Sequence, residues 1–404
     1  MRACGEVRQR SPRVGGEVRY CSPRVGGEVR YCSPRVGGDV RQHSPRGGHE
    51  LREQRQPSGV VLPHERWAIA VGTPLVAGLQ RRRGVRTALL VGAALVLLGA
   101  PLVVLAPALP FLVAGSALQG LGPAGLTTIA MSIAGSARAM GLVTASLATV
   151  RAASPLAGDV VAGTLGWRAT LALPALSLAA VPFVLRRRPV TPLSGSTFDM
   201  AGAALLTALV TALVFVPHTW LPAGGAALAV GALLALRLRA RPDGFVPVEV
   251  VRAPMFLVAA GPAFLLAVVN FGMMYALPPL LARNAGWSGG QVGLAITWPL
   301  LFGGLASYLL LMCTARSRLL VPLVLFPALS VAGVVLAAVS DAWAALLAAQ
   351  ALASLAAASG QGAFATRAAA AVPDGERSAA MGLFNLLYLL GAAFGPAIAT
   401  LLVG

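Results

Sequence analysis

The chain has 404 residues, of which 57% are hydrophobic and only 11% charged, and its mean hydropathy is +0.76. This composition excludes an ordinary soluble domain and predicts a protein that crosses a membrane several times. The formal net charge is +18, and the basic residues are all arginines in short clusters between apolar runs. That pattern indicates membrane topology, so we expect no nucleic-acid partner. The cysteines Cys4, Cys21, Cys32 and Cys313 have neither disulfide nor metal-site spacing.

Residues 1–66 form a tail of a different kind. An 11-residue unit starts at Gly5 as GEVRQRSPRVG and returns at Gly16, Gly27 and Gly38. The unit is rich in arginine and poor in large apolar side chains, so we expect a disordered segment without a core. One interpretation is an arm that contacts anionic lipid or RNA. The other, which we favour, is a tandem DNA repeat translated from a misassigned start.

From Trp67 onward the chain is almost continuously apolar. The stretch from Trp67 to Leu79 is too short for a hydrocarbon core about 30 Å thick, since a helix rises about 1.5 Å per residue, and is predicted to be half of a spanning helix. Eleven further spans are predicted at about 87–105, 107–134, 139–165, 169–185, 200–216, 223–236, 255–282, 292–313, 319–339, 342–365 and 379–403.

The arginines predict the orientation of these spans. If the loop after Leu79 is cytoplasmic, sixteen arginines fall in cytoplasmic connections and only Arg168 and Arg283 fall outside. Such an asymmetry is typical of membrane proteins and supports the segment count. The same alternation places the arginine-rich tail outside, which is unfavourable, so we expect that a first helix has been lost. The chain also stops directly after an apolar span. We predict a multi-pass protein of the cell (inner or plasma) membrane.

Charged side chains inside apolar stretches are the first functional candidates. Arg151 and Asp159 lie within 139–165, where a charge near the bilayer centre costs about 2.5–3.5 kcal/mol on insertion scales. They are eight residues apart, about 12 Å along a helix, so they cannot pair directly. The other polar residues predicted within spans include Gln119, Thr127, Thr128, Asn270, Tyr275, Gln361, Asn385 and Tyr388. Each could line a central cavity or form an interhelical hydrogen bond, worth about 0.6 kcal/mol.

No catalytic motif, metal-ligand cluster or cofactor fingerprint occurs in the sequence. The histidines His43, His49, His64 and His218 are scattered in the tail and one outer loop. An integral-membrane enzyme would need an acidic or histidine cluster at one membrane face. We therefore predict that the protein is not an enzyme and needs no cofactor or metal.

Several stretches resemble the major facilitator superfamily, in particular its fourteen-helix drug–proton antiporter branch of the tetracycline-efflux type. AGLQRRRGVRTALL from Ala77 is similar to the family's loop between helices 2 and 3, and FLVAGSALQGLGPAG from Phe111 to its helix 4. ASPLAGDVVAGTLGWRATLALP from Ala153 resembles the antiporter motif. STFDMAGAALL from Ser196 resembles helix 7, and MGLFNLLYLLGAAFGP from Met381 resembles helix 13. The motif positions are Arg83, Gly84, Arg86, Gly120, Ser154, Pro155 and Gly158.

The resemblance also has departures at functional positions. The family's loop acid falls at Arg81, and its helix 4 arginine falls at Ser116. The Gly-Pro of the antiporter motif is Ser154-Pro155 here, and its closing Gly-Gly is Gly158-Asp159. On this alignment helix 1 is missing, helix 2 is halved and helix 14 is absent, so we expect a chain truncated at both ends.

We therefore expect an all-α membrane bundle of the major facilitator type with about 11–12 spans. The expected parts are the tail 1–66, an N-terminal bundle 67–188, a linker with two extra helices 189–253 and a C-terminal bundle 254–404. The resemblance implies proton-coupled efflux of a small amphipathic compound. Arg151 and Asp159 would serve coupling or substrate charge, and Gln119, Asn270, Asn385, Gln361 and Tyr275 are pathway candidates. A transport-inactive remnant and, less favoured, a membrane enzyme are the alternatives; the oligomeric state stays open.

Overall fold

The computed structural model describes residues 57–106, 108–186, 199–217 and 219–403, except for the side chains at 57–67, 159, 289, 402 and 403. The predictions for residues 1–56, for His218 and for the side chain of Asp159 lie outside this description. Within it, Pro57–Gly404 forms one compact unit. The domain boundaries predicted inside this unit stay a proposal.

The described part of the chain is built from helices and short connections and holds no β-strand, which confirms the predicted all-α membrane bundle. In chain order the elements are α2 (Pro57–Val104), α3 (Leu109–Ile133), α4 (Ala137–Leu165), α5 (Trp167–Leu171), η1 (Leu173–Ala179), α6 (Ala180–Arg186), α7 (Met200–Phe215), α8 (Trp220–Ala240), α9 (Val248–Arg252), α10 (Pro254–Ala285), α11 (Gly289–Thr314), α12 (Leu320–Val339), α13 (Trp343–Ala370), η2 (Asp374–Glu376) and α14 (Arg377–Val403).

The predicted spans correspond to these helices, with differences in length. Among the described residues, 8 helices are long and apolar enough to cross a membrane. The predicted count is higher for three reasons: α2 combines the half-span with the next span, 173–186 and α7 are shorter apolar helices, and α4, the predicted span 139–165, is not among the 8. The predicted single span 169–185 is divided into α5, η1 and α6. The half-span itself is longer than expected, since α2 starts at Pro57, ten residues before Trp67. Residues 57–66, which we expected in the tail, are therefore helical.

The change of direction within α2 depends on Gly84. Its φ of 80° and ψ of 169° interrupt the helix between two arms, 57–83 and 85–104. This left-handed φ is accessible to glycine and costly for other residues, so the motif glycine of the arginine-rich loop has a direct structural role.

Helix α3 packs against both arms of α2 at positions without bulky side chains. A Cβ on Gly125 would lie 2.7 Å from the Val76 side chain on the first arm, and one on Gly115 would lie 2.7 Å from Val103 on the second. Such close backbone approach through small residues is typical of membrane helix packing. The dense glycine and alanine content therefore sets the close packing of this first group of helices.

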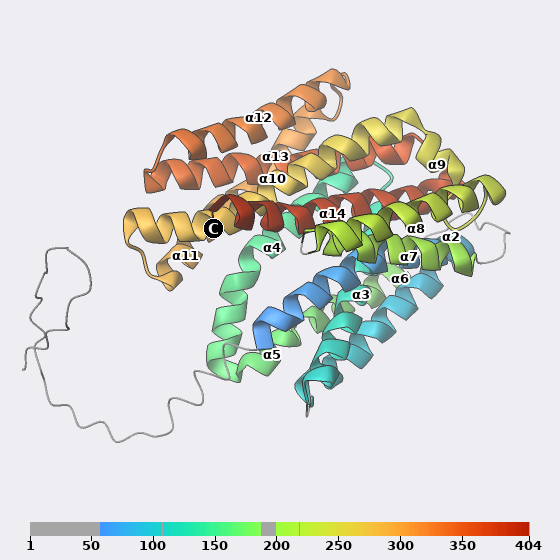
Figure 1. Cartoon of the computed structure of the whole chain (residues 1–404), viewed down its shortest axis with the longest axis horizontal. Coiled ribbons are helices and arrows are strands. Elements are labelled where there is room, and N and C mark those ends of the chain that lie inside the picture. The colour runs from blue at the N-terminus through green and yellow to red at the C-terminus, as the bar shows by residue number, and fades with distance from the viewer. Residues whose placement is uncertain (1–56, 107, 187–198, 218, 404) are drawn as a thin grey trace, which may run out of the picture. The chain divides into compact units, whose positions relative to one another are not determined.

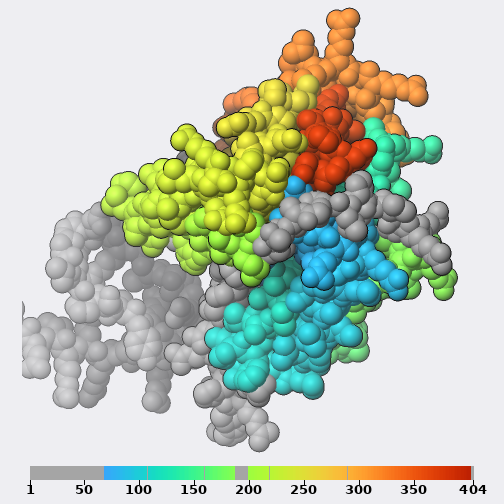
Figure 2. All heavy atoms as spheres, turned by 90° about the vertical axis from the view of Figure 1, so that its right-hand side faces the viewer, coloured from blue at the N-terminus to red at the C-terminus, as the bar shows by residue number. Residues whose placement is uncertain are grey.

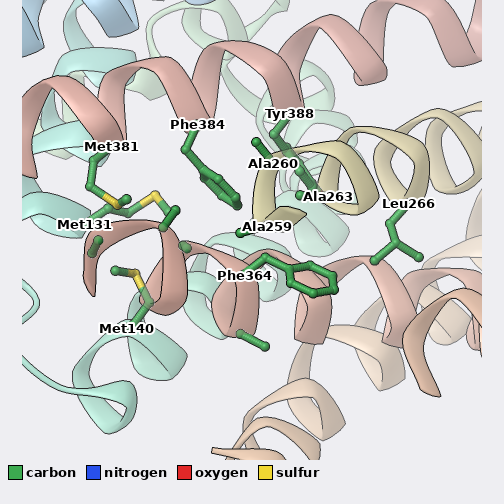
Figure 3. Packing of buried hydrophobic residues seen from close by; sticks show 14 of the residues in the cluster. Met131, Met140, Ala259, Ala260, Ala263, Leu266, Phe364, Met381, Phe384 and Tyr388 are labelled. Atoms are coloured by element: carbon green, nitrogen blue, oxygen red, sulfur yellow. The ribbon is translucent and has the colours of Figure 1, made fainter. Parts of the chain in front are cut away.

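The second group of helices is formed by α10 to α14. Figure 1 shows α10, α13 and α14 running side by side, and these helices are in contact. Their central apolar cluster includes Phe364 of α13 and Phe384 of α14, both fully buried. Figure 3 shows Met131 and Met140, from α3 and α4, reaching the same cluster near Met381. The two groups of helices thus share one apolar core.

The pair α7–α8 packs on α2 and α14 through a separate apolar cluster that includes Leu206, Leu234, Phe245 and Leu386. Figure 2 shows α7 to α9 (green to yellow) beside α14 (red), with α2 and α3 (blue to cyan) below them. The predicted pair of extra helices is therefore attached to the outside of the bundle, along both groups of helices.

The predicted cytoplasmic connections meet at one end of the bundle. Arg81 forms an ion pair with Glu376 and donates to the carbonyl of Gly244 (3.0 Å). Arg377 donates to the carbonyl of Ala134, which belongs to the connection before α4. These contacts join connections that the arginine pattern assigns to the same side.

Two predicted outer connections, between α10 and α11 and between α12 and α13, also contact each other. The Asn284 amide donates to the Asp341 carboxylate (3.3 Å), and the Trp287 and Trp343 rings lie 5.5 Å apart. The loop contacts thus follow the alternation that the sequence predicts. Which end faces the cytoplasm stays a prediction.

Candidate functional site

A small cavity lies where α4 meets the second group of helices. It measures about 30 Å³. Its lining is Ala148, Arg151 and Ala152 of α4, Asn270, Phe271 and Met274 of α10, Leu300 of α11, Ser354, Ala358 and Gln361 of α13, and Tyr388 of α14. The structure thus brings together the predicted candidates Arg151, Asn270 and Gln361, and it adds Tyr388, a predicted membrane-embedded polar residue.

Local helix chemistry positions Arg151. Pro155 has no N–H, so the carbonyl of Arg151, four residues earlier, loses its helical donor. The hydroxyl of Ser154 donates to that carbonyl at 2.8 Å. The Ser154-Pro155 pair therefore repairs the helix at the turn that carries the arginine, as membrane helices with proline require.

The guanidinium of Arg151 lies over an aromatic ring inside the bundle. Its central carbon is 5.4 Å from the centroid of Phe271, and the guanidinium also interacts with the side chain of Tyr388. A cation–π contact contributes about 0.5–1 kcal/mol at exposed sites and about 2 kcal/mol or more when desolvated. This attraction offsets part of the cost of a charge at this depth.

The amide of Asn270 is held by a second helix. Gln350 of α13 donates to Oδ1 of Asn270 at 3.2 Å, and both side chains are buried. This bond uses one of the two lone pairs of the amide oxygen, and the amide nitrogen of Asn270 is a hydrogen-bond donor on a residue that lines the cavity. Gln361, also buried, adds a second amide from α13.

The cavity in this conformation is small. A water needs about 10–15 Å³ of such volume, whereas ligand pockets usually measure about 300–1,000 Å³. The space of about 30 Å³ can hold a few atoms of a ligand but not a drug-sized molecule. Any larger compound requires α4 to separate from α10, α13 and α14.

Helix α4 packs closely on its partners over its first half. A Cβ on Gly362 of α13 would lie 2.6 Å from the Thr144 hydroxyl, and one on Gly304 of α11 would lie 2.8 Å from the Thr149 nitrogen. Beyond Ala152 the helix is largely exposed, up to Leu165 at 74%. Figure 1 shows this end of α4 leading to α5, away from α11. The cavity therefore lies near the point where the close contact ends.

Three predicted pathway residues lie elsewhere. Gln119 is buried on α3, and its amide, oriented to satisfy both neighbours, donates to the Leu171 carbonyl (2.6 Å) and accepts from the Ala100 N–H (3.3 Å). Asn385 is buried on α14 outside the cavity lining, and its amide nitrogen has no hydrogen-bond partner among the described residues. Tyr275 is 39% exposed. Asp159 belongs to α4, but its side chain is not described.

The motif positions lie on three helices, α2, α3 and α4. Arg83 and Arg86 are exposed on either side of Gly84, at the turn of α2. Gly120 is buried on α3. In the α4 motif, the carbonyl of Gly158 accepts from the Thr170 hydroxyl at 3.3 Å, which ties α4 to α5.

Some lining residues carried no signal in the sequence. Phe271, Met274 and Leu300 are apolar residues within apolar spans, and Ser354 resembles many small residues of its helix. The one sequence feature that could have indicated Phe271 as a lining residue is its position directly after Asn270. Among the described residues, no group of three or more His, Cys, Asp and Glu side chains could hold a metal ion.

These features describe a multi-pass helical membrane protein with a polar, arginine-containing cavity between packed groups of helices. Residues 259–404 match the family model described as Major Facilitator Superfamily. No curated protein matches the sequence.

Among solved structures, the chain is similar to the human organic anion transporter MFSD10 (TETRAN). The TM-score is 0.61 and the sequence identity 17%, over 85% of this chain and 78% of that one. At this identity the likeness shows the fold. The chain therefore has the fold of that transporter, and its residues 259–404 match the superfamily's model.

Proposed function

We propose that the protein is an alternating-access transporter that exports a small amphipathic compound in exchange for protons. The observation that carries the proposal is the Arg151 cavity, which lies between α4 and the helices α10, α13 and α14. Transporter sites typically lie near the bilayer midplane at the interface of two moving parts. The cavity walls come from helices that could separate as such parts.

The contacts around the cavity support a state that is closed at the predicted cytoplasmic end. There Arg81 pairs with Glu376, and Gly382 of α14 approaches Ala77 of α2 closely. At the other end, most of the described side chains of α4 from Ser154 to Leu165 are exposed. Opening the first end while closing the second would expose the cavity alternately to the two sides of a membrane.

Proton coupling and drug export rest on the sequence resemblance to the antiporter branch. Asp159, in the antiporter motif of α4, is the candidate for the proton-binding carboxylate. The neighbour of known structure is named an organic anion transporter, which agrees with a substrate that has both a polar and an apolar part.

Reconstitution tests the proposal. The full chain in proteoliposomes with an imposed pH gradient should drive saturable flux of at least one member of a panel of amphipathic fluorescent dyes. A protonophore should abolish that flux. Dye flux equal to that of protein-free liposomes for the whole panel would overturn the transport function.

A further inference from the structure

We propose that the Arg151 cavity selects a small organic anion, with a carboxylate on Arg151 and an aromatic or aliphatic body against Phe271 and Met274. This inference names the substrate class of the transport proposed above and rests on that function.

The first step is the unbalanced charge of the cavity. Arg151 is the cationic side chain of the lining, and among the residues whose side chains the structure describes the lining holds no carboxylate. In the described residues the ion pairs are Arg81–Glu376 and Arg237–Asp199, so neither involves Arg151. The Phe271 ring stabilises the cation without neutralising it. An anionic ligand supplies the missing countercharge, through charge-assisted hydrogen bonds that are strong in a low-dielectric site.

The second step is the set of polar groups beside the arginine. The Asn270 oxygen accepts a hydrogen bond from Gln350, and the amide nitrogen of this lining residue is a further hydrogen-bond donor. Tyr388 is 2% exposed and can donate its hydroxyl proton. Guanidinium, amide N–H and phenol O–H groups together form a donor set that matches the acceptor oxygens of a carboxylate.

The third step is the size and the apolar part of the lining. A volume of about 30 Å³ accommodates little more than a carboxylate group in the closed conformation. Phe271, Met274 and Leu300 line the same space. A ligand body that enters when the helices separate meets these apolar side chains. A cationic amphiphile of the same size would meet the same surface but would be repelled by Arg151.

Binding to the purified full chain tests the charge preference. We would measure equilibrium binding of three probes with one ring system: anionic naphthoate, neutral naphthamide and cationic naphthylmethylammonium. We expect naphthoate to bind at least about tenfold more tightly than the other two, the usual scale of one hydrogen bond to a charged group. Equal binding of the three probes, a preference for the cation, or no binding of naphthoate would overturn the inference.

Substitutions locate the preference. Arg151→Gln should lose the preference for naphthoate over naphthamide, and Arg151→Lys should retain part of it because the charge remains. Tyr388→Phe should weaken naphthoate binding several-fold and leave naphthamide binding less affected. The matched control is Arg168→Gln, which removes an exposed arginine that also lies over an aromatic ring, 5.3 Å from Trp167. Naphthoate selectivity that survives Arg151→Gln would overturn the assignment.

Folding and transport are measured separately. Each variant is checked by its thermal midpoint and by its elution as a single species, and Arg151→Lys gives a second reading if Arg151→Gln does not fold. Flux of the same probes into proteoliposomes reports the transport function. Anion-selective binding without flux would support the binding inference and contradict the transport proposal. Saturable flux without charge preference would support the transport proposal and contradict the binding inference.

Discussion

Arg81 and Glu376 form a largely buried ion pair between segments that are 295 residues apart in the chain. The Arg81 side chain is 3% exposed, and it also donates to the carbonyl of Gly244, in the connection between α8 and α9. One side chain from the turn of α2 thus joins three connections at one end of the bundle. The resemblance places Arg81 where the family has an acidic residue. In this chain a positive side chain therefore makes the contact at this end of the bundle, and its partner Glu376 is the acid.

Glu376→Gln should destabilise the protein markedly. Removing one partner of a buried pair leaves the other charge uncompensated, which costs about 3–5 kcal/mol. Glu376 is 16% exposed, so we expect the lower end, about 3 kcal/mol. The measurement is the shift of the thermal or denaturant unfolding midpoint of the purified protein. The control is Asp374→Asn, at an exposed acid in the same η2 turn. Equal midpoints for the two variants would show that the pair does not hold this end together.

Asp199→Asn should destabilise the protein at neutral pH and much less in acid. Asp199 accepts hydrogen bonds from Arg237 (2.7 Å), from the N–H of Gly202 (3.1 Å) and from the N–H of Phe245 (3.3 Å). Burial alone raises the pKa of Asp199, but these hydrogen bonds outweigh it, so the pKa lies below its ordinary value. We expect a loss of about 1.5–3 kcal/mol at pH 7, the scale of a hydrogen bond to a charged group.

The sign of the pH dependence follows from the lowered pKa of Asp199. Its stabilisation is fully present above the unfolded-state pKa of about 3.9 and is lost as the pH falls through the lower folded-state pKa. The unfolding midpoints of the wild type and Asp199→Asn should therefore converge below about pH 4. Asp243→Asn, at an exposed acid near the same connection, is the control and should follow the wild type throughout. A constant difference from pH 7 to pH 3 would contradict the assignment.

The order and approximate extent of most helices could be predicted from the sequence because apolar runs alternate with arginine clusters, whereas the start of α2 at Pro57 and the division of 169–185 into α5, η1 and α6 could not. The length of an apolar run sets how far a helix extends, and the charge asymmetry fixes the alternation. The presence of Arg151 within a span also pointed to an interior cavity, since a lipid-facing charge is too costly.

The direction in which each polar side chain points could not be predicted. Most spans are apolar all round, so no hydrophobic stripe marks the buried face. Gln119, Asn270 and Asn385 look alike in the sequence, yet only Asn270 lines the cavity. Nor could loop composition reveal the partner of Arg81, because its pairing with Glu376 depends on how distant helices pack. The order of the spans could thus be predicted from local sequence, whereas the residues that line the cavity could be identified only from the tertiary structure.

Gly391→Ala should destabilise the contact between α14 and α10. A Cβ at Gly391 would clash with the carbonyl oxygen of Phe264 and lie 3.0 Å from the Cβ of Ala267. Because the nearest atom belongs to the backbone, the helices must separate, and overpacking of this kind costs about 1–3 kcal/mol. Gly261→Ala on α10 is the matched control, since no atom lies within 4 Å of its Cβ position. It should be neutral or stabilising, because alanine favours the helix by about 1 kcal/mol. Unfolding midpoints that fall equally for both would contradict the close approach.

Asp159→Asn should abolish flux driven by a pH gradient in the reconstituted full chain. Asp159 is the carboxylate within the antiporter motif of α4, and the amide that replaces it can neither bind nor release a proton at neutral pH. Exchange of substrate across the membrane without a pH gradient should survive, since it needs the cavity but not coupling. The measurement is dye flux with and without the gradient, with Asp243→Asn as the control for loss of one acidic residue elsewhere. Gradient-driven flux that is unchanged in Asp159→Asn would remove this carboxylate from the coupling mechanism. Loss of both kinds of flux would assign it to the transport path itself, because a residue needed only for protons leaves exchange intact.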